Sequence, residues 1–190
     1  SQRQGKFSDP TWRIGCEYDK WFRQYCKQTL KNIGEIYPDY QGQGYQIAGF
    51  GWWQGHKDIN NSEWNRDYEQ NLVALIKDLR KDFDAPNAPF VVSTIAFGGK
   101  KMAGKALSIH QAQMAVSDAK KYPEFKDNVA SVDCRPFYRG GSHHYGSNAE
   151  TYMLVGEGMG KAMAKLIKGL PNGGASKIKG LQEEKTVDTK

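Results

Sequence analysis

The sequence predicts an α/β protein, a three-layer α/β/α sandwich in which helices cover both faces of a parallel sheet. Segments with helical periodicity alternate along the chain with short apolar segments that suit buried strands. Their order is one helix followed by three strand–helix units, and consecutive units of this kind favour parallel strands. Residues 90–97 are mostly apolar, which favours a central position in the sheet.

The first half of the chain contains two expected helices and the first expected strand. Apolar side chains recur at spacings of three and four residues from about Glu17 to Ile36, which predicts an amphipathic helix. After a turn of proline and glycine residues, Tyr45–Trp53 is expected to form a buried strand whose glycines indicate close backbone packing. A second helix is expected over Ser62–Asp82, with Asn61 or Ser62 as its cap.

Two further strands are expected in the second half, each followed by a helix. The strand Phe90–Phe97 is rich in β-branched residues and is followed by two glycines. Ser108–Gln111 has the spacing of a capping box, which predicts a helix from there to about Lys121. Val129–Cys134 is the third expected strand.

The last helix marks the end of the expected domain. It is expected to begin near Ser147, because Ser147 and Glu150 form a second capping-box pattern. Residues 1–169 then form one domain, and residues 170–190 are expected to be a disordered basic tail. Three strands make a small sheet, and no strand precedes the first helix. We therefore expect a C-terminal portion of a larger domain, whose first strand or strands lie on an N-terminal polypeptide of the same gene product.

Composition argues against several function classes. The formal net charge is +6, but much of the excess lysine lies after residue 160. We see no basic stripe with interleaved aromatic residues, so nucleic-acid binding is not expected. No run of eighteen apolar residues indicates a membrane span. The three cysteines are too few and too irregularly spaced for a disulfide scaffold or a zinc site. Cys16 and Cys26 either pair or remain free thiols.

Ligands of open parallel sheets bind beyond the carboxyl ends of the strands, which directs attention to the segments that follow Trp53, Phe97 and Cys134. Trp52–Asp58 places an amide, a glycine and titratable groups in one turn. Gln54 and the Gly55 N–H can bind an oxyanion there, although a tight turn with solvated polar residues explains the same pattern. Residues 135–145 include His143–His144, and a histidine in this place can act as a general base. No third ligand is evident beside the pair, so no metal is expected.

Two motifs carry a family resemblance. The first is Trp52–Gly55 followed by Asp58, and the second is His144–Tyr145 leading into Asn148–Gly156. Their order and separation resemble the sialate O-acetylesterase-like carbohydrate esterases of the SGNH hydrolase superfamily. The resemblance implies a flavodoxin-like α/β/α fold. It also implies hydrolysis of acetyl esters on carbohydrates by a serine nucleophile and a histidine base, without a metal or organic cofactor.

Site roles follow from the same resemblance. It makes His144 the base and places Gln54 and Gly55 at the oxyanion site, while Asp58 serves the turn or contacts the substrate. The family's Gly-Asp-Ser or Gly-Gln-Ser nucleophile motif has no match here, so the serine is expected on an upstream segment. Relatives that act on polysaccharides are commonly exported, which implies a secreted or periplasmic protein.

The orienting acid is the second departure from the family pattern. The family often places an acid three residues before the histidine, and Gly141 occupies that position. Asp133, at the end of the third expected strand, is our candidate for the carboxylate that orients His144. Two other interpretations remain open: a non-catalytic carbohydrate-binding or scaffold subunit derived from such an esterase, or a proteolytic fragment.

Overall fold

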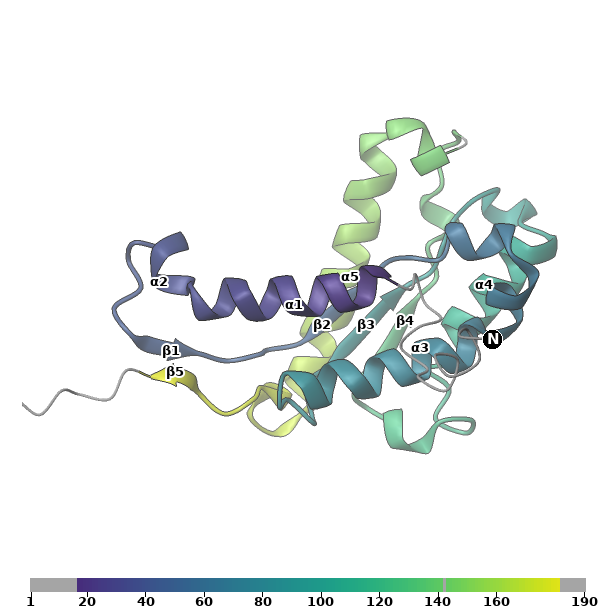
Figure 1. Ribbon diagram of the computed structural model, residues 1–190. Coiled ribbons are helices and arrows are strands. Elements are labelled where there is room, and N and C mark those ends of the chain that lie inside the picture. The colour runs from purple at the N-terminus through teal and green to yellow at the C-terminus, as the bar shows by residue number, and fades with distance from the viewer. Residues whose placement is uncertain (1–16, 142, 182–190) are drawn as a thin grey trace, which may run out of the picture.

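A computed structural model describes residues 17–141 and 143–181, and its centre is a three-stranded parallel sheet (Figure 1). The strands, in spatial order, are β2 (Phe50–Trp52), β3 (Phe90–Ser93) and β4 (Val129–Val132). In the described residues β2 and β4 each pair with β3, and Phe90 aligns with Phe50 on one side and Val129 on the other. The predicted α/β class with parallel strands is therefore confirmed.

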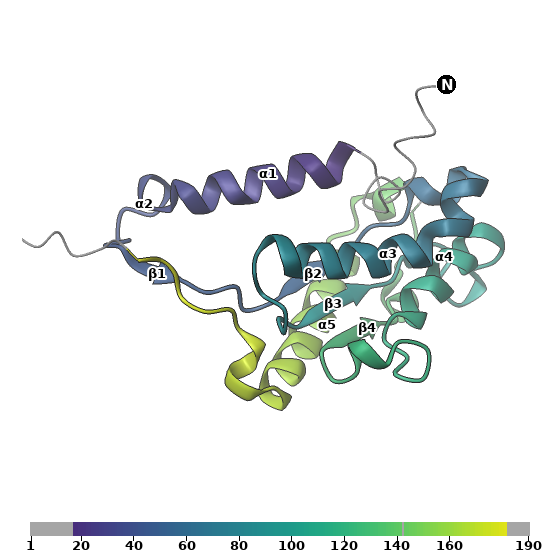
Figure 2. The same cartoon turned by 60° about the horizontal axis from the view of Figure 1, so that its bottom comes forward.

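Helices cover both faces of this sheet. α3 (Ser62–Asp82) and α4 (Gly104–Ala115) pack together on one face, and α5 (Ala149–Gly169) packs against β3 and β4 from the other face (Figure 2). α1 (Glu17–Lys31) and the single turn α2 (Ile33–Ile36) precede the sheet, and α2 lies well to one side of it (Figures 1 and 2). None of the helices in the described ranges is long and apolar enough to cross a membrane.

The largest part of the core lies between α3 and the sheet. The apolar side chains that α3 buries there repeat at helical spacing and pack with Phe90 and Val92; they are Tyr68, Leu72, Leu75, Ile76 and Leu79. Full burial of such a side chain stabilises the fold by about 1.5–3 kcal/mol relative to exposure. Asn61 caps the helix, because its side-chain oxygen accepts hydrogen bonds from two backbone N–H groups of the first turn. The helix has the predicted bounds.

The first predicted strand is divided in two, and part of the predicted tail is ordered, because residues of these two segments pair with each other. β1 (Gln43–Tyr45) leaves the parallel sheet and pairs antiparallel with β5 (Lys179–Leu181). Between β1 and β2, the Ile47 N–H donates to Ser176 Oγ, and the Ser176 N–H donates to the Ile47 carbonyl. Residues 171–181 are thus tied to the domain, contrary to the disorder predicted over 170–190. Residues 182–190 lie outside the described residues.

Both capping-box predictions are wrong. α4 begins at Gly104, four residues before Ser108, because Ala106 and Leu107 pack against the core and extend the helix toward its N-terminus. α5 is capped by Asn148, whose side chain accepts a hydrogen bond from the Thr151 N–H, and Ser147 before it has a left-handed φ of 58°. A local capping pattern cannot register the tertiary contacts that lengthen or shift a helix.

Several predicted elements are shorter in the structure. The first helix is interrupted at Asn32, β3 and β4 end before Thr94 and Asp133, and α4 ends at Ala115 instead of near Lys121. Short 3-10 turns fill the intervening segments at Lys57–Asn60, Gly99–Lys101, Pro123–Phe125, Arg135–Phe137, His143–Ser147 and Pro171–Gly174. Because the strands are short, the residues that follow them lie in loops at the carboxyl edge of the sheet.

Candidate active site

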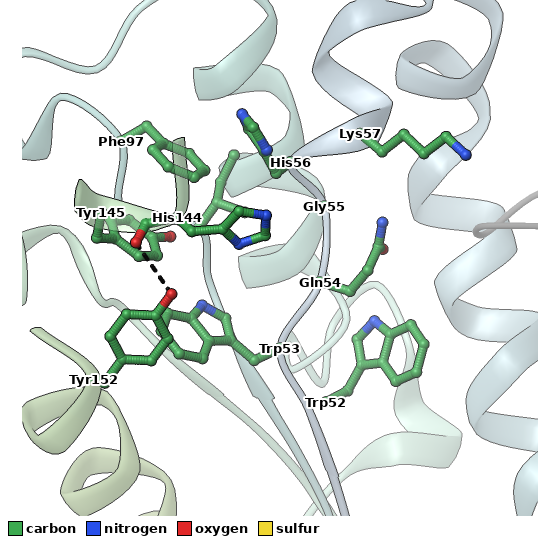
Figure 3. Close-up of a pocket in the computed structure, with 11 residues that line it drawn as sticks. Trp52, Trp53, Gln54, Gly55, His56, Lys57, Phe97, His144, Tyr145 and Tyr152 are labelled. Carbon is green, nitrogen blue, oxygen red and sulfur yellow. Dashed lines mark hydrogen bonds between the residues drawn. The ribbon is translucent and has the colours of Figure 1, made fainter. Parts of the chain in front are cut away.

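A pocket of about 460 Å³ opens at the carboxyl edge of the parallel sheet (Figure 3). It is formed by the turn after β2, the segment after β3, and the loop that leads into α5. Its lining residues are Trp52, Trp53, Gln54, Gly55, His56, Lys57, Ile95, Phe97, His144, Tyr145 and Tyr152. The structure therefore brings Gln54, Gly55 and His144 to one site, although they are up to 90 residues apart in the sequence.

The turn after β2 is held from inside the protein. The Tyr68 hydroxyl donates a hydrogen bond of 2.9 Å to the Gln54 backbone carbonyl, and Gln113 Nε2 donates one of 2.6 Å to the same oxygen. Gly55 is buried and has a φ of 143°, a backbone conformation that residues other than glycine rarely adopt. A Cβ at this position would lie 2.9 Å from Ile109 Cγ2. Glycine is therefore required here by both backbone and packing.

Asp58 lies behind this turn and does not line the pocket. Its side chain is almost completely buried, and Gln54 Nε2 donates a 2.6 Å hydrogen bond to its Oδ2. Burial raises the pKa of Asp58 above its usual value, and the hydrogen bond from Gln54 opposes that shift. Oδ1 has no hydrogen-bond partner among the described residues. Of the two predicted roles of Asp58, this position favours the one in the turn over direct contact with a substrate.

The loop that carries His144 has an unusual backbone. His144, Tyr145 and Ser147 have φ values of 48°, 55° and 58°, and Gly146 between them has a φ of 58°. Each non-glycine residue in this region costs on the order of 1–3 kcal/mol, so the surrounding structure must hold the loop in place. Gly141 packs directly beneath it, because a Cβ there would lie only 2.4 Å from the Tyr145 carbonyl carbon.

Tyr145 anchors this loop to the sheet. It is buried, its hydroxyl accepts a 3.1 Å hydrogen bond from the Ala96 N–H, and its ring stacks on Phe97 at 4.4 Å and on Trp53 at 5.5 Å between centroids. The Tyr152 hydroxyl, from the first turn of α5, donates to the His144 carbonyl at 3.1 Å (Figure 3). These contacts fix the main chain of His144 and leave its imidazole facing the pocket.

Three histidines lie close together beside the pocket, and two of them, His56 and His144, line it. The ring centroid of His56 lies 5.9 Å from that of His144 and 5.7 Å from that of His143, and its ring also packs on Phe97. Burial lowers the pKa of His56, and the charges of His144 and His143 lower it further. Within the described ranges, no group of three histidine, cysteine or acidic side chains is arranged to hold a metal ion.

Asp133 does not meet His144. Its Oδ2 accepts a 2.6 Å hydrogen bond from Arg135 Nη2, and its Oδ1 lies 3.1 Å from Nε2 of the buried His110 on α4. The Arg135 guanidinium is the largest cause that holds the pKa of Asp133 well below its usual value. No hydrogen bond joins Asp133 to His144 in the described structure, so the predicted pairing is not observed. The reason is that α4 and Arg135 occupy both carboxylate oxygens.

The sequence assigns no role in the site to Phe97, Tyr145 or Gln113. Tyr145 directly follows His144, and Phe97 ends a predicted strand, so their positions were visible but their stacking was not. Gln113 is completely buried in α4. The only sequence signal for it is a polar residue beside Ala112 on the apolar face of a helix, and such a residue needs a partner when it is buried.

The fold and the pocket define an α/β protein with a polar and aromatic site beyond the ends of its parallel strands. Residues 12–165 match the family model described as carbohydrate esterase, sialic acid-specific acetylesterase, and the chain belongs to this family. It is 32% identical over 89 residues to a probable carbohydrate esterase of Arabidopsis thaliana, covering 45% of this chain and 34% of the relative. The chain thus spans about a third of that relative's length.

A solved structure is also similar. It is the X-ray structure of an Arabidopsis thaliana protein, which matches with a TM-score of 0.49 and 25% sequence identity. The match covers 74% of this chain and 51% of that chain.

Proposed function

We propose that the protein hydrolyses acetyl esters on carbohydrates, with His144 as the general base and the Gln54–Gly55 turn on the oxyanion side. Membership of the carbohydrate esterase family supports the reaction class. The observation that carries the residue roles is that His144, Gln54 and Gly55 line the same pocket, with the His144 imidazole directed into it (Figure 3).

In the proposed reaction, a serine hydroxyl attacks the acetyl carbonyl carbon while His144 accepts the hydroxyl proton. The carbonyl oxygen becomes an oxyanion, which the Gly55 N–H and the second N–H of the Gln54 amide stabilise. The bond to the sugar oxygen then breaks, and His144 returns the proton to the leaving alkoxide. Water hydrolyses the acetyl-serine by the same proton transfers, and acetate leaves.

The nucleophilic serine is proposed to come from a segment outside this sequence. No serine lines the pocket in the part of the chain that the structure describes. Ser147, three residues after His144, does not line it either, and its left-handed backbone belongs to the loop before α5. Asp133 is not assigned as the partner of His144, because Arg135 and His110 bind its carboxylate.

The aromatic walls of the pocket suit a sugar ester. Trp53 contacts Tyr145 face to face and Tyr152 edge to face, so the three rings form one continuous apolar wall. Such a wall offers flat surface to the apolar face of a sugar ring or to an acetyl methyl group. The same wall favours a second candidate function, a non-catalytic carbohydrate-binding subunit, in which the site binds without turnover.

The test is hydrolysis of nitrophenyl acetate and of O-acetylated sugars by the full natural protein. Denaturing intact-mass analysis of the same sample identifies the polypeptide that carries a Gly-x-Ser segment. His144→Ala is expected to lower kcat/KM by about 10²–10⁴, the usual contribution of a general base.

His143→Ala is the matched control. His143 is the adjacent exposed histidine and does not line the pocket, so its removal should leave turnover nearly unchanged. Equal turnover in His144→Ala and wild type rules out the proposed base. Carbohydrate binding without any hydrolysis by the wild-type protein would favour the binding subunit.

A further inference from the structure

Gln113 connects the ends of two neighbouring strands beneath the pocket. Its side chain is completely buried. Its Oε1 accepts a 2.8 Å hydrogen bond from the Ile95 N–H, just beyond β3, and its Nε2 donates to the Gln54 carbonyl, just beyond β2, at 2.6 Å. The Ile95 N–H is only a donor, so it must face the amide oxygen, and this fixes which end of the amide faces Gln54.

Tyr68 completes the arrangement from α3. Its hydroxyl donates to the Gln54 carbonyl at 2.9 Å and accepts from the second hydrogen of Gln113 Nε2 at 3.1 Å. The Gln54 carbonyl therefore accepts two hydrogen bonds from completely buried side chains. Every donor of this small network is used, which is the condition under which a buried polar network makes a structure rigid.

The direction of the Gln54 carbonyl determines the direction of the next N–H. No cis peptide bond occurs in the described residues, and in a planar trans peptide the C=O and N–H point in opposite directions. Because the carbonyl points inward to Gln113 and Tyr68, the Gly55 N–H points away from them, toward the pocket that Gly55 lines. No hydrogen bond among the described residues uses this N–H.

Gly55 also packs directly on Gln113. A Cβ at Gly55 would lie 3.1 Å from Gln113 Nε2, so the backbone of the turn rests on the amide itself. The position of the Gln113 amide thus sets both the location and the rotation of the plane of the Gln54–Gly55 peptide. Displacement of the amide leaves the peptide free to turn its N–H away from the pocket.

We infer that Gln113 is a positioning residue for the esterase reaction: with Tyr68, it holds the Gln54–Gly55 peptide so that the Gly55 N–H faces the developing oxyanion. The inference rests on the proposed function and deepens it. Gln113 does not touch the substrate. It acts through the Gln54 carbonyl, and its contribution is expected in the transition state more than in substrate binding.

The experiment compares Gln113→Met, Tyr68→Phe and Ser131→Ala in the full natural protein. Gln113→Met keeps the approximate length of the side chain and removes all three hydrogen bonds of the amide. Tyr68→Phe removes one donor to the Gln54 carbonyl and leaves the bond to Ile95 intact, so it serves if Gln113→Met folds poorly. Ser131→Ala is the control, because Ser131 Oγ donates to the Gln113 backbone carbonyl at 2.6 Å and does not touch the turn.

Two readouts are measured. With nitrophenyl acetate, Gln113→Met should lower kcat by about tenfold to a hundredfold, below the 10²–10³ seen for complete loss of an oxyanion donor, with little change in KM. Tyr68→Phe should give a smaller loss of kcat, and Ser131→Ala should leave kcat unchanged. By NMR of ¹³C-labelled protein, the Gln54 carbonyl signal should move upfield in Gln113→Met and Tyr68→Phe, as expected when a carbonyl loses a donor, and not in Ser131→Ala.

The outcomes separate this inference from the proposed function. An unmoved Gln54 carbonyl signal in both variants overturns the inference at any level of activity, and so does a rise in KM with unchanged kcat. If the wild-type protein hydrolyses no acetyl ester, the proposed function fails. The role of Gln113 in holding the peptide is then decided by the carbonyl signal alone.

Discussion

Gly55→Ala tests whether the turn beneath the pocket is as tightly constrained as its geometry indicates. The φ of 143° is unfavourable for alanine and costs on the order of 1–3 kcal/mol. The new Cβ would lie 2.9 Å from Ile109 Cγ2 and 3.1 Å from Ile95 Cγ2, closer than the usual separation of about 3.5–4.0 Å between carbon atoms. Overpacking of this kind costs about 1–3 kcal/mol.

Together these effects predict a loss of about 2–6 kcal/mol in the free energy of unfolding. At about 2–4 °C per kcal/mol for a domain of this size, the Tm should fall by roughly 4–24 °C. Urea denaturation and calorimetry measure both quantities. Gly156→Ala is the matched control, because Gly156 is exposed on α5 with open space around it, and alanine there should stabilise the protein by about 0.5–1 kcal/mol.

The reasoning would be refuted if Gly55→Ala unfolded at the same denaturant concentration as wild type. Such a result would mean that the turn relaxes freely, and the argument that Gln113 sets the direction of the Gly55 N–H would lose its support. A large loss of stability in Gly156→Ala would show instead that substitutions of glycine destabilise this protein regardless of their local geometry.

Three further changes have defined expectations. Gln54→Ala should lower kcat with acetyl esters by about one to three powers of ten and change KM less, whereas a change confined to KM would make Gln54 a substrate contact. Arg80→Met should lower the free energy of unfolding, measured by urea denaturation, by about 2–4 kcal/mol. The reason is that the buried guanidinium donates to the Ala88 carbonyl and to both the carbonyl and the side-chain oxygen of Asn128. Arg66→Met, on the exposed surface, should leave the midpoint of the urea transition unchanged. The depressed pKa of Asp133 stabilises the fold above the unfolded pKa of about 3.9, and this contribution is lost as pH falls through the lower folded pKa. Lowering the pH should therefore reduce the free energy of unfolding less in Asp133→Asn than in wild type. Parallel curves of unfolding free energy against pH for the two proteins would contradict this.

Local sequence patterns were sufficient to predict the elements whose stabilising features lie within one continuous segment or follow from the order of the elements. α3 has its predicted bounds because its apolar face and its cap, Asn61, lie within one continuous segment. The parallel order of the strands followed from the alternation of strands and helices, since such crossovers have few solutions. The rule that ligands of parallel sheets bind beyond the carboxyl ends of the strands directed attention to the segments of Gln54 and His144, which line one pocket.

Long-range pairings were not predictable in the same way. β1 and β5 pair although more than 130 residues separate them, and neither segment has an apolar pattern from which this pairing could be predicted. Asp133 was expected beside His144, but the position of α4 brings His110 to its carboxylate, and Arg135 takes the other oxygen. Which partner a carboxylate finds depends on how the helices pack, and that is settled only when the whole core forms.

The sequence by itself determined the class of this protein, its alternation of strands and helices, and the two segments that supply polar groups to the pocket. The tertiary structure alone decided how those groups are held. The aromatic stack beneath His144, the inward Gln54 carbonyl and its donor Gln113 join residues from different elements. Periodicity and capping act over a few residues of chain, whereas hydrogen bonds and ring contacts act over a few ångströms of space, and only folding relates the two.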